Sequence, residues 1–505
     1  MMNCLRNIGI LLLYLTLAPS ASALADTPAF PGAEGFGTKT THARGKPVFH
    51  VSRLDDEDKW QKVQYLQEGQ FRWALAKAAE AGGGYIVFDV SGAIQLKRTA
   101  QIPSNVYIAG QSAPGKGIAI QGAGIGIGGK DNPAKNVVIR HIRFRGKAQR
   151  SADAFNLEGP GTENIVLDHV SISFFQDGAV DIVNGARNVT VQWCHMGDAV
   201  FSGTREKYHC EPNLLRSNVS HVSLHHNYYT HCHSRVPQVS ENCVKDGFLI
   251  EVSNNVVYDY RKYPSNFDAV NGKGNVVGNY YIPGRFTHGD KGPGTQRGTV
   301  TGSNNFTVYV RDNLSVDGLG HDDVGCPGKD QDTCRGYDQW VTGARPDDSR
   351  PETDIMGKQG AIGPTPGVLD YSPKRFKDIP KITYIPAEEN IDEVISKFGA
   401  LPRDNTDKRL VKELLTRSGG WKLEMPDDNN TYEGKSRVDD DGDGMADDWE
   451  AKRGGDLEPN GHDLDPVYDN IEVYLNELAE ALVKQAEPVA AQKAVLEADR
   501  ALKRP

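Results

Sequence analysis

Three aspartates are spaced so that they can share a cation. Asp177 and Asp181 stand four residues apart in a strand-like run, and such side chains point to one face of a sheet. Asp153 precedes Asp177 by 24 residues, the length of one repeat unit described below. Carboxylates that converge repel one another, and a ligand set made only of oxygen suits calcium. We predict a Ca²⁺ site; the alternative for the Asp-x-x-x-Asp pair alone is a solvated strand end.

An arginine follows this acidic cluster two repeat units later. Arg235 lies in the segment His233-Ser234-Arg235-Val236-Pro237, immediately after a strand-like run over residues 222–229. A guanidinium beside a calcium site is unusual unless an anion bridges the two. A uronate carboxylate would do so, with one oxygen on the cation and the sugar C5–H facing Arg235. The alternative is that Arg235 only neutralises charge in the groove.

A second acidic pattern near the C-terminus has the spacing of a 12-residue EF-hand calcium loop. Trp449 would begin the exiting helix, and a degenerate second loop would include Asp463 and Asp465. The alternative is a disordered acidic linker, but the glycine and the final glutamate both fit a calcium loop that stabilises the fold. The predicted ligands and turn residue are Asp439, Asp441, Asp443, Gly444, Met445 (through its carbonyl), Asp447 and Glu450.

Short β-rich runs from about residue 100 to 320 must position the first cluster. Runs of this kind begin near Asn136, Asn164 and Asn188, which are 28 and 24 residues apart. One such strand-turn unit cannot bury its own apolar face, so neighbouring units must stack. A β-sandwich would need hairpins every 8–12 residues, and this spacing is missing. We therefore predict an all-β fold, a right-handed parallel β-helix.

Asparagines recur in a second register that supports the stacking. Asn227, Asn255, Asn279 and Asn313 are 28, 24 and 34 residues apart. Asparagine tolerates a left-handed backbone, and its amide can bond to an asparagine one coil away. We predict asparagine stacks at the corners of the coil.

The sequence also predicts caps and boundaries. Residues 71–80 form a helix with Phe71, Leu75 and Ala78 on one face, which would cap the open end of the coils. Pro488 interrupts the polar C-terminal tail. The predicted divisions are a signal peptide 1–25, a β-helix catalytic domain 26–425, a linker 426–436, and a calcium-loop and helical module 437–505.

The N-terminus predicts export. Arg6 is followed by an apolar run over residues 8–17 and by Ala23-Leu24-Ala25, typical of a signal peptide rather than an uncleaved anchor. Removing residues 1–25 leaves six cysteines, an even number that favours disulfides in an exported chain. Cys326 and Cys334 are the simplest pair, and the pairing of the other four stays open. We expect an extracellular or periplasmic, monomeric protein without membrane contact.

The overall charge excludes one class of partner. Without the leader, 56 basic residues stand against 67 acidic ones, a net charge of about −11. Nucleic acid is therefore disfavoured, and any polyanion must be bound locally through metal and arginine.

Several segments in order make the chain resemble the pectate lyase family, family 1 of the polysaccharide lyases. The resemblance covers roughly residues 28–320. It implies Ca²⁺-assisted β-elimination of polygalacturonate-type substrates, with Asp153, Asp177 and Asp181 as calcium ligands and Arg235 as the base. Alkaline conditions would favour an arginine base. The segments are Phe30-Pro31-Gly32-Ala33-Glu34-Gly35-Phe36-Gly37, Ile86-Val87-Phe88-Asp89-Val90-Ser91-Gly92, Ile108-Ala109-Gly110-Gln111-Ser112-Ala113-Pro114-Gly115, Leu167-Asp168-His169-Val170-Ser171 and Arg235-x-Pro237.

Two positions depart from the family pattern. Ser240 stands where a second arginine is common, and Phe201 stands where a substrate-binding lysine is expected. Lys207 or Arg205, slightly further along, would replace that lysine. These changes bear on the choice of uronan or on its methylation, and they leave the calcium and arginine core intact.

Other readings of the sequence are weaker. Five histidines between His221 and His233 alternate strand faces and lack a further ligand, so zinc is disfavoured. Asp168-His169 suggests an acid/base pair, but a buried, hydrogen-bonded role is preferred. The rival functions are a β-helix glycoside hydrolase with paired carboxylates and a non-catalytic polysaccharide-binding protein.

Overall fold

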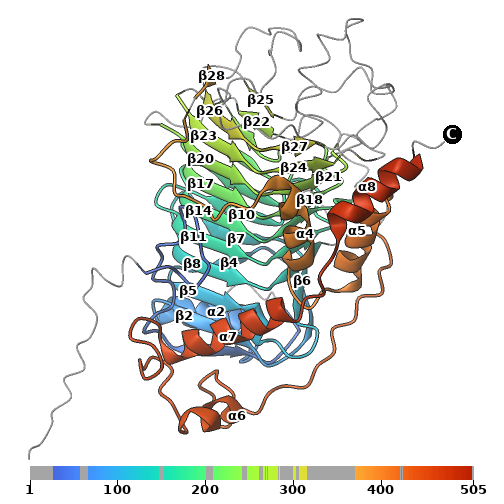
Figure 1. The fold of residues 1–505 in the computed structure, drawn as a ribbon. Coiled ribbons are helices and arrows are strands. Elements are labelled where there is room, and N and C mark those ends of the chain that lie inside the picture. The colour runs from blue at the N-terminus through green and yellow to red at the C-terminus, as the bar shows by residue number, and fades with distance from the viewer. Residues whose placement is uncertain are drawn as a thin grey trace, which may run out of the picture.

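The computed structural model shows a long coil of parallel strands with helices along one side and at one end (Figure 1). Among the described residues, no helix has the length and apolar character needed to cross a membrane. The described residues are 27–56, 66–146, 153–200, 209–240, 247–260, 265–267, 269, 271–282, 284, 300–302, 306–315, 370–372, 374–420, 422 and 425–502.

Three parallel sheets form the coil, and each turn of the chain adds one strand to each sheet. The predicted parallel β-helix is confirmed, although it begins at β1, well before residue 100. Sheet A contains β1 (Val48–Val51), β2 (Gly84–Phe88), β5 (Val106–Ala109), β8 (Lys135–Arg140), β11 (Glu163–Asp168), β14 (Arg187–Gln192), β17 (Ser220–His225), β20 (Leu249–Ser253), β23 (Lys273–Val277), β26 (Thr307–Arg311) and β28 (Asp370–Tyr371). Sheet B contains β3 (Gly92–Leu96), β6 (Ile118–Gly122), β9 (Arg143–Gly146), β12 (Ser171–Ser173), β15 (His195–Gly197), β18 (Tyr228–Thr230), β21 (Val256–Tyr258), β24 (Tyr280–Ile282) and β27 (Leu314–Ser315). Sheet C contains β4 (Ala100–Ile102), β7 (Ile125–Gly128), β10 (Phe155–Glu158), β13 (Val180–Val183), β16 (Leu214–Arg216), β19 (Gln238–Val239), β22 (Ser265–Phe267) and β25 (Val300–Gly302).

Aliphatic residues stack in register inside the coil. Val137, Ile165, Val189 and Val222 are paired from strand to strand along sheet A, and all four are fully buried. A single coil exposes such side chains above and below, so each coil is stabilised only by its neighbours. This dependence explains why the apolar runs recur at the length of one turn.

Two asparagine stacks lie at the corners of the coil, as the sequence predicts. In the buried stack, the amide nitrogens of Asn227, Asn255 and Asn279 each donate to the side-chain oxygen of the next asparagine at 2.8–3.0 Å. In the other, the direction is reversed: Asn136, Asn164 and Asn188 each donate to the side-chain oxygen of the preceding asparagine, starting with Asn105, at 2.9–3.1 Å. The φ angles of these three donors are positive, between 53° and 61°, whereas in the first stack the left-handed residue is the one before the asparagine, such as Asn254. The stacks satisfy polar groups that the turns would otherwise leave unpaired.

Helix α2 (Phe71–Glu80) covers the first coils, as predicted. Its buried residues Phe71, Ala74, Leu75 and Ala78 belong to the same apolar core as the inside of the coil. The helix therefore closes one end of the core against solvent.

Helices from the C-terminal part of the chain cover two of the sheets from outside. Helices α4 (Ala387–Lys397), α5 (Asn405–Leu415) and α8 (Ala491–Leu502) contribute to one apolar cluster with the outward side chains of sheet B, such as Tyr228 and Tyr258. Helix α7 (Asn470–Lys484) packs on the outer face of sheet A beside β2 and β5 (Figure 1). Residues 485–490 separate α7 from α8, which confirms the predicted interruption at Pro488.

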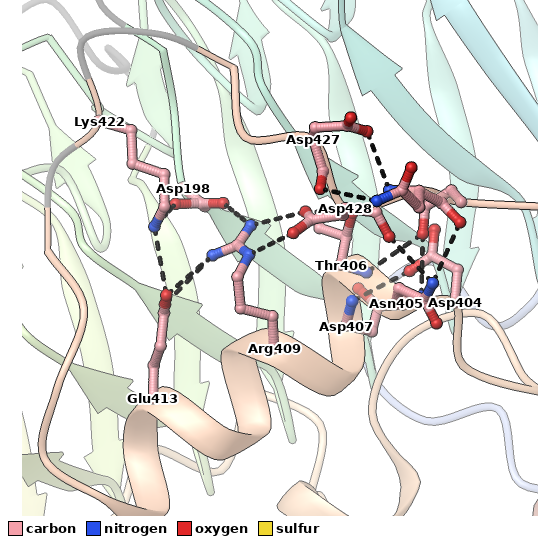
Figure 2. Close-up of polar contacts among 12 residues, drawn as sticks. Asp198, Asp404, Asn405, Thr406, Asp407, Arg409, Glu413, Lys422, Asp427 and Asp428 are labelled. Atoms are coloured by element: carbon pink, nitrogen blue, oxygen red, sulfur yellow. Dashed lines mark hydrogen bonds and ion pairs between the residues drawn. The ribbon is translucent and has the colours of Figure 1, made fainter.

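Buried ion pairs fix α5 against the coil (Figure 2). Arg409 on α5 contacts Asp198, which follows β15, at 2.6 Å, and it also contacts Asp428 at 2.8 Å. Lys422 bridges Asp198 and Glu413 at 3.2 and 3.3 Å. Charges with several partners tolerate burial, because attraction to the opposite charges offsets the hydration that each loses on leaving water.

The predicted linker runs extended along the coil rather than away from it. The carbonyl of Glu433 accepts from the N–H of Lys116, and the hydroxyl of Tyr432 donates to Asp404 at 2.9 Å. The division into domains stays a prediction.

Candidate active site

The predicted acidic cluster lies at the N-terminal ends of two neighbouring strands of sheet C, β10 and β13. Asp181 is within β13, but Asp177 precedes the strand in the loop after β12, so the expectation of one continuous run is wrong. The chain turns a corner between sheets B and C at this point. Asp153 lies in the corresponding loop before β10, which pairs with β13 at an offset of 25 residues.

The backbone places two of these carboxylates close together. Gly178 donates its N–H to Asp153 Oδ1 at 3.0 Å, and Leu214 donates its N–H to Asp181 Oδ1 at 3.2 Å. A Cβ atom on Gly178 would lie 2.3 Å from Asp181 Oδ1 and 3.0 Å from Asp153 Oδ1. A side chain at this position would displace the carboxylates, so glycine is required here.

The cluster is electrostatically frustrated. Burial raises the pKa of Asp181 well above its usual value, and repulsion from Asp153 and Asp177 adds to the rise. Burial and the charge of Asp177 likewise raise the pKa of Asp153. When a cation binds to such a cluster, its charge stabilises the ionised form of the carboxylates. The all-oxygen set of Asp153, Asp177 and Asp181 fits calcium.

Arg235 faces this cluster from the loop before β19, two strands along sheet C. Its attraction opposes the rise in the pKa of both Asp153 and Asp181. The arginine predicted from sequence therefore lies near enough to Asp153 and Asp181 for its charge to act on them.

Two further residues at the site were missed in the sequence. Glu211 Oε2 lies 2.7 Å from Arg235 Nε, and His209 Nε2 contacts Asp177 closely and lies 3.4 Å from Glu211 Oε2. Asp177, His209 and Glu211 have ligand atoms that all lie within 4.8 Å of one another. Both missed residues precede β16 by a few positions, as Asp177 precedes β13. That shared position, in the coil between the acids and the arginine, is the signal that would have found them.

The predicted substrate-binding residues Arg205 and Lys207 lie outside the described residues, as does Phe201. Ser240 follows β19 on the coil of Arg235, and its N–H donates to the carbonyl of Leu215. The roles of Arg205 and Lys207 stay predictions.

The pair Asp168-His169 has the structural role expected of it. Asp168 is buried and accepts from Arg140 Nε at 2.7 Å and from Gln192 Nε2 at 2.8 Å. His169 stacks between His141 and Trp193 at centroid distances of 4.8 and 6.0 Å. A carboxylate with these partners is held in place and is remote from solvent.

The other histidines have separate surroundings. His225 and His226 contact each other through their Nδ1 atoms, whereas His231 contacts Asp259 and Glu413. His233 contacts Glu211. These histidines do not form a candidate metal-binding group with one another within the described part of the chain.

Cysteines in the described ranges are free thiols: Cys194, Cys210 and Cys232 are all buried. Cys243, Cys326 and Cys334 lie outside the described residues. The predicted disulfides therefore stay predictions.

The C-terminal acidic loop adopts a tight turn. Asp439, Asp441 and Asp443 have carboxylate oxygens within 4.8 Å of one another, and Asp439 accepts the N–H groups of Gly442 and Gly444. Asp443 is half-buried, and burial together with repulsion from neighbouring acids raises its pKa to about 7. The three carboxylates thus lack a compensating charge among themselves.

The remaining predicted ligands take other partners in this structure. Asp447 Oδ1 accepts from the N–H of Asp440, and Glu450 Oε1 accepts from the N–H of Leu457. Trp449 lies in the short helix α6 (Asp447–Glu450), as expected of the exiting helix. Met445 is fully buried against α7 and sheet A, which fixes the loop to the first coils.

Gly444 has a specific steric reason to be glycine. Its φ is +91°, and a Cβ there would lie 2.8 Å from Val48 Cγ1 and 2.9 Å from Ile471 Cδ1. The sixth position of the loop therefore packs directly between β1 and α7.

Curated relatives match the chain almost from end to end, although no family model matches it. The protein named "Probable pectate lyase C" of Emericella nidulans is 29% identical over 488 residues, 94% of this chain and 97% of the relative. The protein of the same name in Aspergillus oryzae is 27% identical over 94% of this chain and 99% of its own. A "Pectate trisaccharide-lyase" of Thermotoga sp. is 30% identical over 33% of this chain and 45% of its own.

Solved structures are similar only at low scores. The thermostable pectate lyase PL 47 is 15% identical over 74% of this chain and 97% of its own, with a TM-score of 0.46. A pectate lyase of Bacillus sp. N165, in complex with trigalacturonate, is 16% identical over 56% of this chain and 86% of its own, with a TM-score of 0.39. The full-length curated relatives carry the assignment: they support a place in a pectate lyase family and identify the chain as a polysaccharide lyase.

Proposed function

We propose that the protein is an exported, calcium-dependent pectate lyase that cleaves polygalacturonate-type polyuronate by β-elimination. The observation that carries the proposal is that Asp153, Asp177, Asp181 and Arg235 all lie at the N-terminal ends of strands of sheet C. A hydrolase would not use this combination, since it needs a protonated acid and an ionised base rather than an arginine, and turnover separates the lyase from a binding protein.

Asp153, Asp177 and Asp181 would hold the calcium. When bound, calcium supplies positive charge that neutralises the uronate carboxylate and acidifies the proton on C5. Arg235 removes this proton, the C–H electron pair forms the C4–C5 double bond, and O4 leaves with the electrons of its bond to C4. Arg205 and Lys207 are proposed to bind further uronate carboxylates. Since an arginine side chain loses its proton only at high pH, we propose an alkaline optimum.

The assay is the ultraviolet absorbance of the 4,5-unsaturated product from polygalacturonate, with Ca²⁺ or with chelator at alkaline pH. We expect product only with Ca²⁺, and at least a ~10³-fold loss of kcat in Arg235→Ala with folding intact. Arg187→Ala is the matched control, because Arg187 begins β14 of sheet A and pairs with Glu163 away from the acids. New reducing ends without absorbance would instead indicate a hydrolase, and binding without turnover in the parent protein would indicate a binding module.

We also propose that the C-terminal loop binds a second calcium. Asp439, Asp441 and Asp443 would supply carboxylate oxygens, with the carbonyl of Met445 and the acids Asp447 and Glu450 completing the set after rearrangement. This ion would stabilise the contact between the C-terminal module and the first coils without entering the reaction. The expected result is a thermal stabilisation by Ca²⁺ that Asp441→Ala weakens while kcat at saturating Ca²⁺ stays unchanged.

A further inference from the structure

Glu211 is surrounded by donors from the arginine's own loop. Its Oε1 accepts from Ser234 Oγ at 3.2 Å and lies 3.3 Å from His233 Nδ1, while its Oε2 lies 2.7 Å from Arg235 Nε. His209 approaches Oε2 from the other side at 3.4 Å. Three consecutive residues, His233 to Arg235, therefore converge on one carboxylate that comes from the previous coil.

We propose that Glu211 is the positioning residue for Arg235, an inference that rests on the elimination mechanism above. The carboxylate contacts the guanidinium through Nε. This contact is an ion pair between Oε2 and Nε without hydrogen-bond geometry. With Glu211 at Nε, the outer nitrogens Nη1 and Nη2 are the part of Arg235 that would act on the C5 proton of a substrate held by the acidic cluster.

Charge and burial suit Glu211 to this role. Burial raises its pKa, but the contacts with His233, Arg235 and His209 outweigh burial and lower the pKa below its usual value. Glu211 is therefore ionised throughout the neutral and alkaline range. The side chains of Arg235 and Glu211 are only 22% and 10% exposed, so water screens the pair less than it screens a surface ion pair.

The alternative to such an anchor is a mobile base. Arginine has four rotatable side-chain bonds, and ordering them at the moment of reaction costs conformational entropy. Arg235 also has a backbone φ of 61°, in the left-handed region that non-glycine residues seldom adopt. The backbone and the side chain are thus both constrained at this residue, as expected where a reacting group needs one fixed orientation.

His209 extends the contact to the acidic cluster. Its ring lies between Asp177 and Glu211, so the order of contacts is Asp177, His209, Glu211 and Arg235. We infer that this bridge fixes the distance between the calcium ligands and the base.

The test is Glu211→Gln, which keeps the size of the side chain and removes its charge. We expect kcat on polygalacturonate to fall about 10–100-fold, because the base is no longer held, with KM changed less than about threefold. Glu211→Asp keeps the charge and should recover part of kcat. The matched control is Glu163→Gln, since Glu163 pairs with Arg187 Nε at 2.9 Å on the coil surface, and it should leave kcat unchanged.

Chemical rescue makes the test independent of folding defects. Added guanidine should restore elimination to Arg235→Ala with a measurable half-saturating concentration. In the double variant Arg235→Ala/Glu211→Gln that concentration should rise at least about tenfold, because the anchor for the guanidinium is gone. An equal concentration in both variants would overturn the role of Glu211.

The outcomes separate this inference from the proposed function. If Arg235→Ala eliminates at the parental rate, the arginine-base mechanism itself has failed. If Arg235→Ala is inactive while Glu211→Gln keeps the parental kcat, only the positioning role is wrong. If Glu211→Gln changes KM and calcium affinity rather than kcat, Glu211 belongs to the metal site, and the inference is equally overturned.

Discussion

Raising the pH should weaken the attachment of α5 to the coil through one buried histidine. His231 is fully buried after β18, with Nδ1 2.6 Å from Asp259 Oδ2 and Nε2 2.9 Å from Glu413 Oε2 on α5. Burial lowers its pKa, but the hydrogen bonds to these two carboxylates outweigh burial and raise the pKa to about 9. His231 is therefore charged in the folded protein at neutral pH.

The size and sign of the effect follow from linkage. A histidine whose pKa is higher in the folded than in the unfolded protein stabilises the fold fully below the unfolded value, near 6.5. This stabilisation disappears as the pH rises through 9. A difference from 6.5 to about 9 corresponds to about 3 kcal/mol of unfolding free energy. The loss falls within the alkaline range in which we propose that elimination is fastest.

The assay is urea denaturation at fixed Ca²⁺, measured at pH 7 and pH 10 for the parent and for His231→Gln. The neutral glutamine cannot titrate, so the parent should lose about 2.5 kcal/mol more than the variant between these pH values, slightly less than the full difference because the unfolded histidine already titrates below pH 7. The matched control is His195→Gln, since burial lowers the pKa of His195 to about 3 and keeps its ring neutral at both pH values. Its profile should follow that of the parent.

Parallel losses in the parent and in His231→Gln would refute the reasoning, because the titration would then belong to other groups. A smaller loss in His195→Gln than in the parent would also count against it. If the prediction holds, enzyme incubated above pH 9 should inactivate faster than His231→Gln does, relative to each at pH 7.

Three further predictions concern the acidic clusters and the asparagine stacks. Asp181→Asn removes a charge whose formation is opposed by burial and by two neighbouring acids. It should therefore stabilise the metal-free protein in thermal melts at pH 8, while kcat with Ca²⁺ collapses. Destabilisation of the metal-free protein would contradict the repulsion inferred for this cluster. The pKa of Asp443 is raised to about 7, so the metal-free fold should lose stability as the pH rises from about 4 to 7. Ca²⁺ should therefore raise the melting temperature more at pH 8 than at pH 5. Asp443→Asn should reduce this difference between the two pH values. Asn255→Ala leaves several buried partners unsatisfied and should lower the free energy of unfolding, measured by urea denaturation, by at least about 3 kcal/mol. Asn105→Ala, at the partly exposed end of the other stack, should lower it by less than half as much. Equal losses would contradict the argument from burial.

The repeat is predictable because it obeys local rules. Interior positions such as Ile165 and Val189 must be apolar in every coil, and corner positions such as Asn188 must tolerate a left-handed backbone and bond to the neighbouring coil. These requirements recur at the length of one turn, so the spacing of residue types reveals the architecture. Helix α2 is predictable for a similar reason, since its apolar face repeats at helical spacing.

The acidic cluster and the arginine were predictable in part. The one-coil offset brings Asp153 level with the loop that carries Asp177, and two further coils bring Arg235 to the same edge of sheet C. The expectation that Asp177 and Asp181 share a strand was wrong, because a corner between two sheets interrupts the run. The backbone N–H groups of Gly178 and Leu214 hold Asp153 and Asp181 in place, so the acids converge even though strand periodicity does not apply to them.

Contacts across coils and across distant segments were not predictable from local pattern. Glu211 has no motif of its own, and its role depends on the coil that brings it beside Arg235. His231 is likewise an ordinary residue until α5, 182 positions further along, places Glu413 against its ring.

The sequence alone therefore determined the parallel coil, its asparagine corners and the identity of the candidate metal and base residues, because each repeats at or is offset by the length of a turn. The tertiary structure decided which charges meet, how deeply they are buried and which helices cover the sheets. The physical reason is that periodicity is a property of neighbouring residues, whereas the pKa of a carboxyl or an imidazole depends on everything within a few ångströms, whatever its place in the chain.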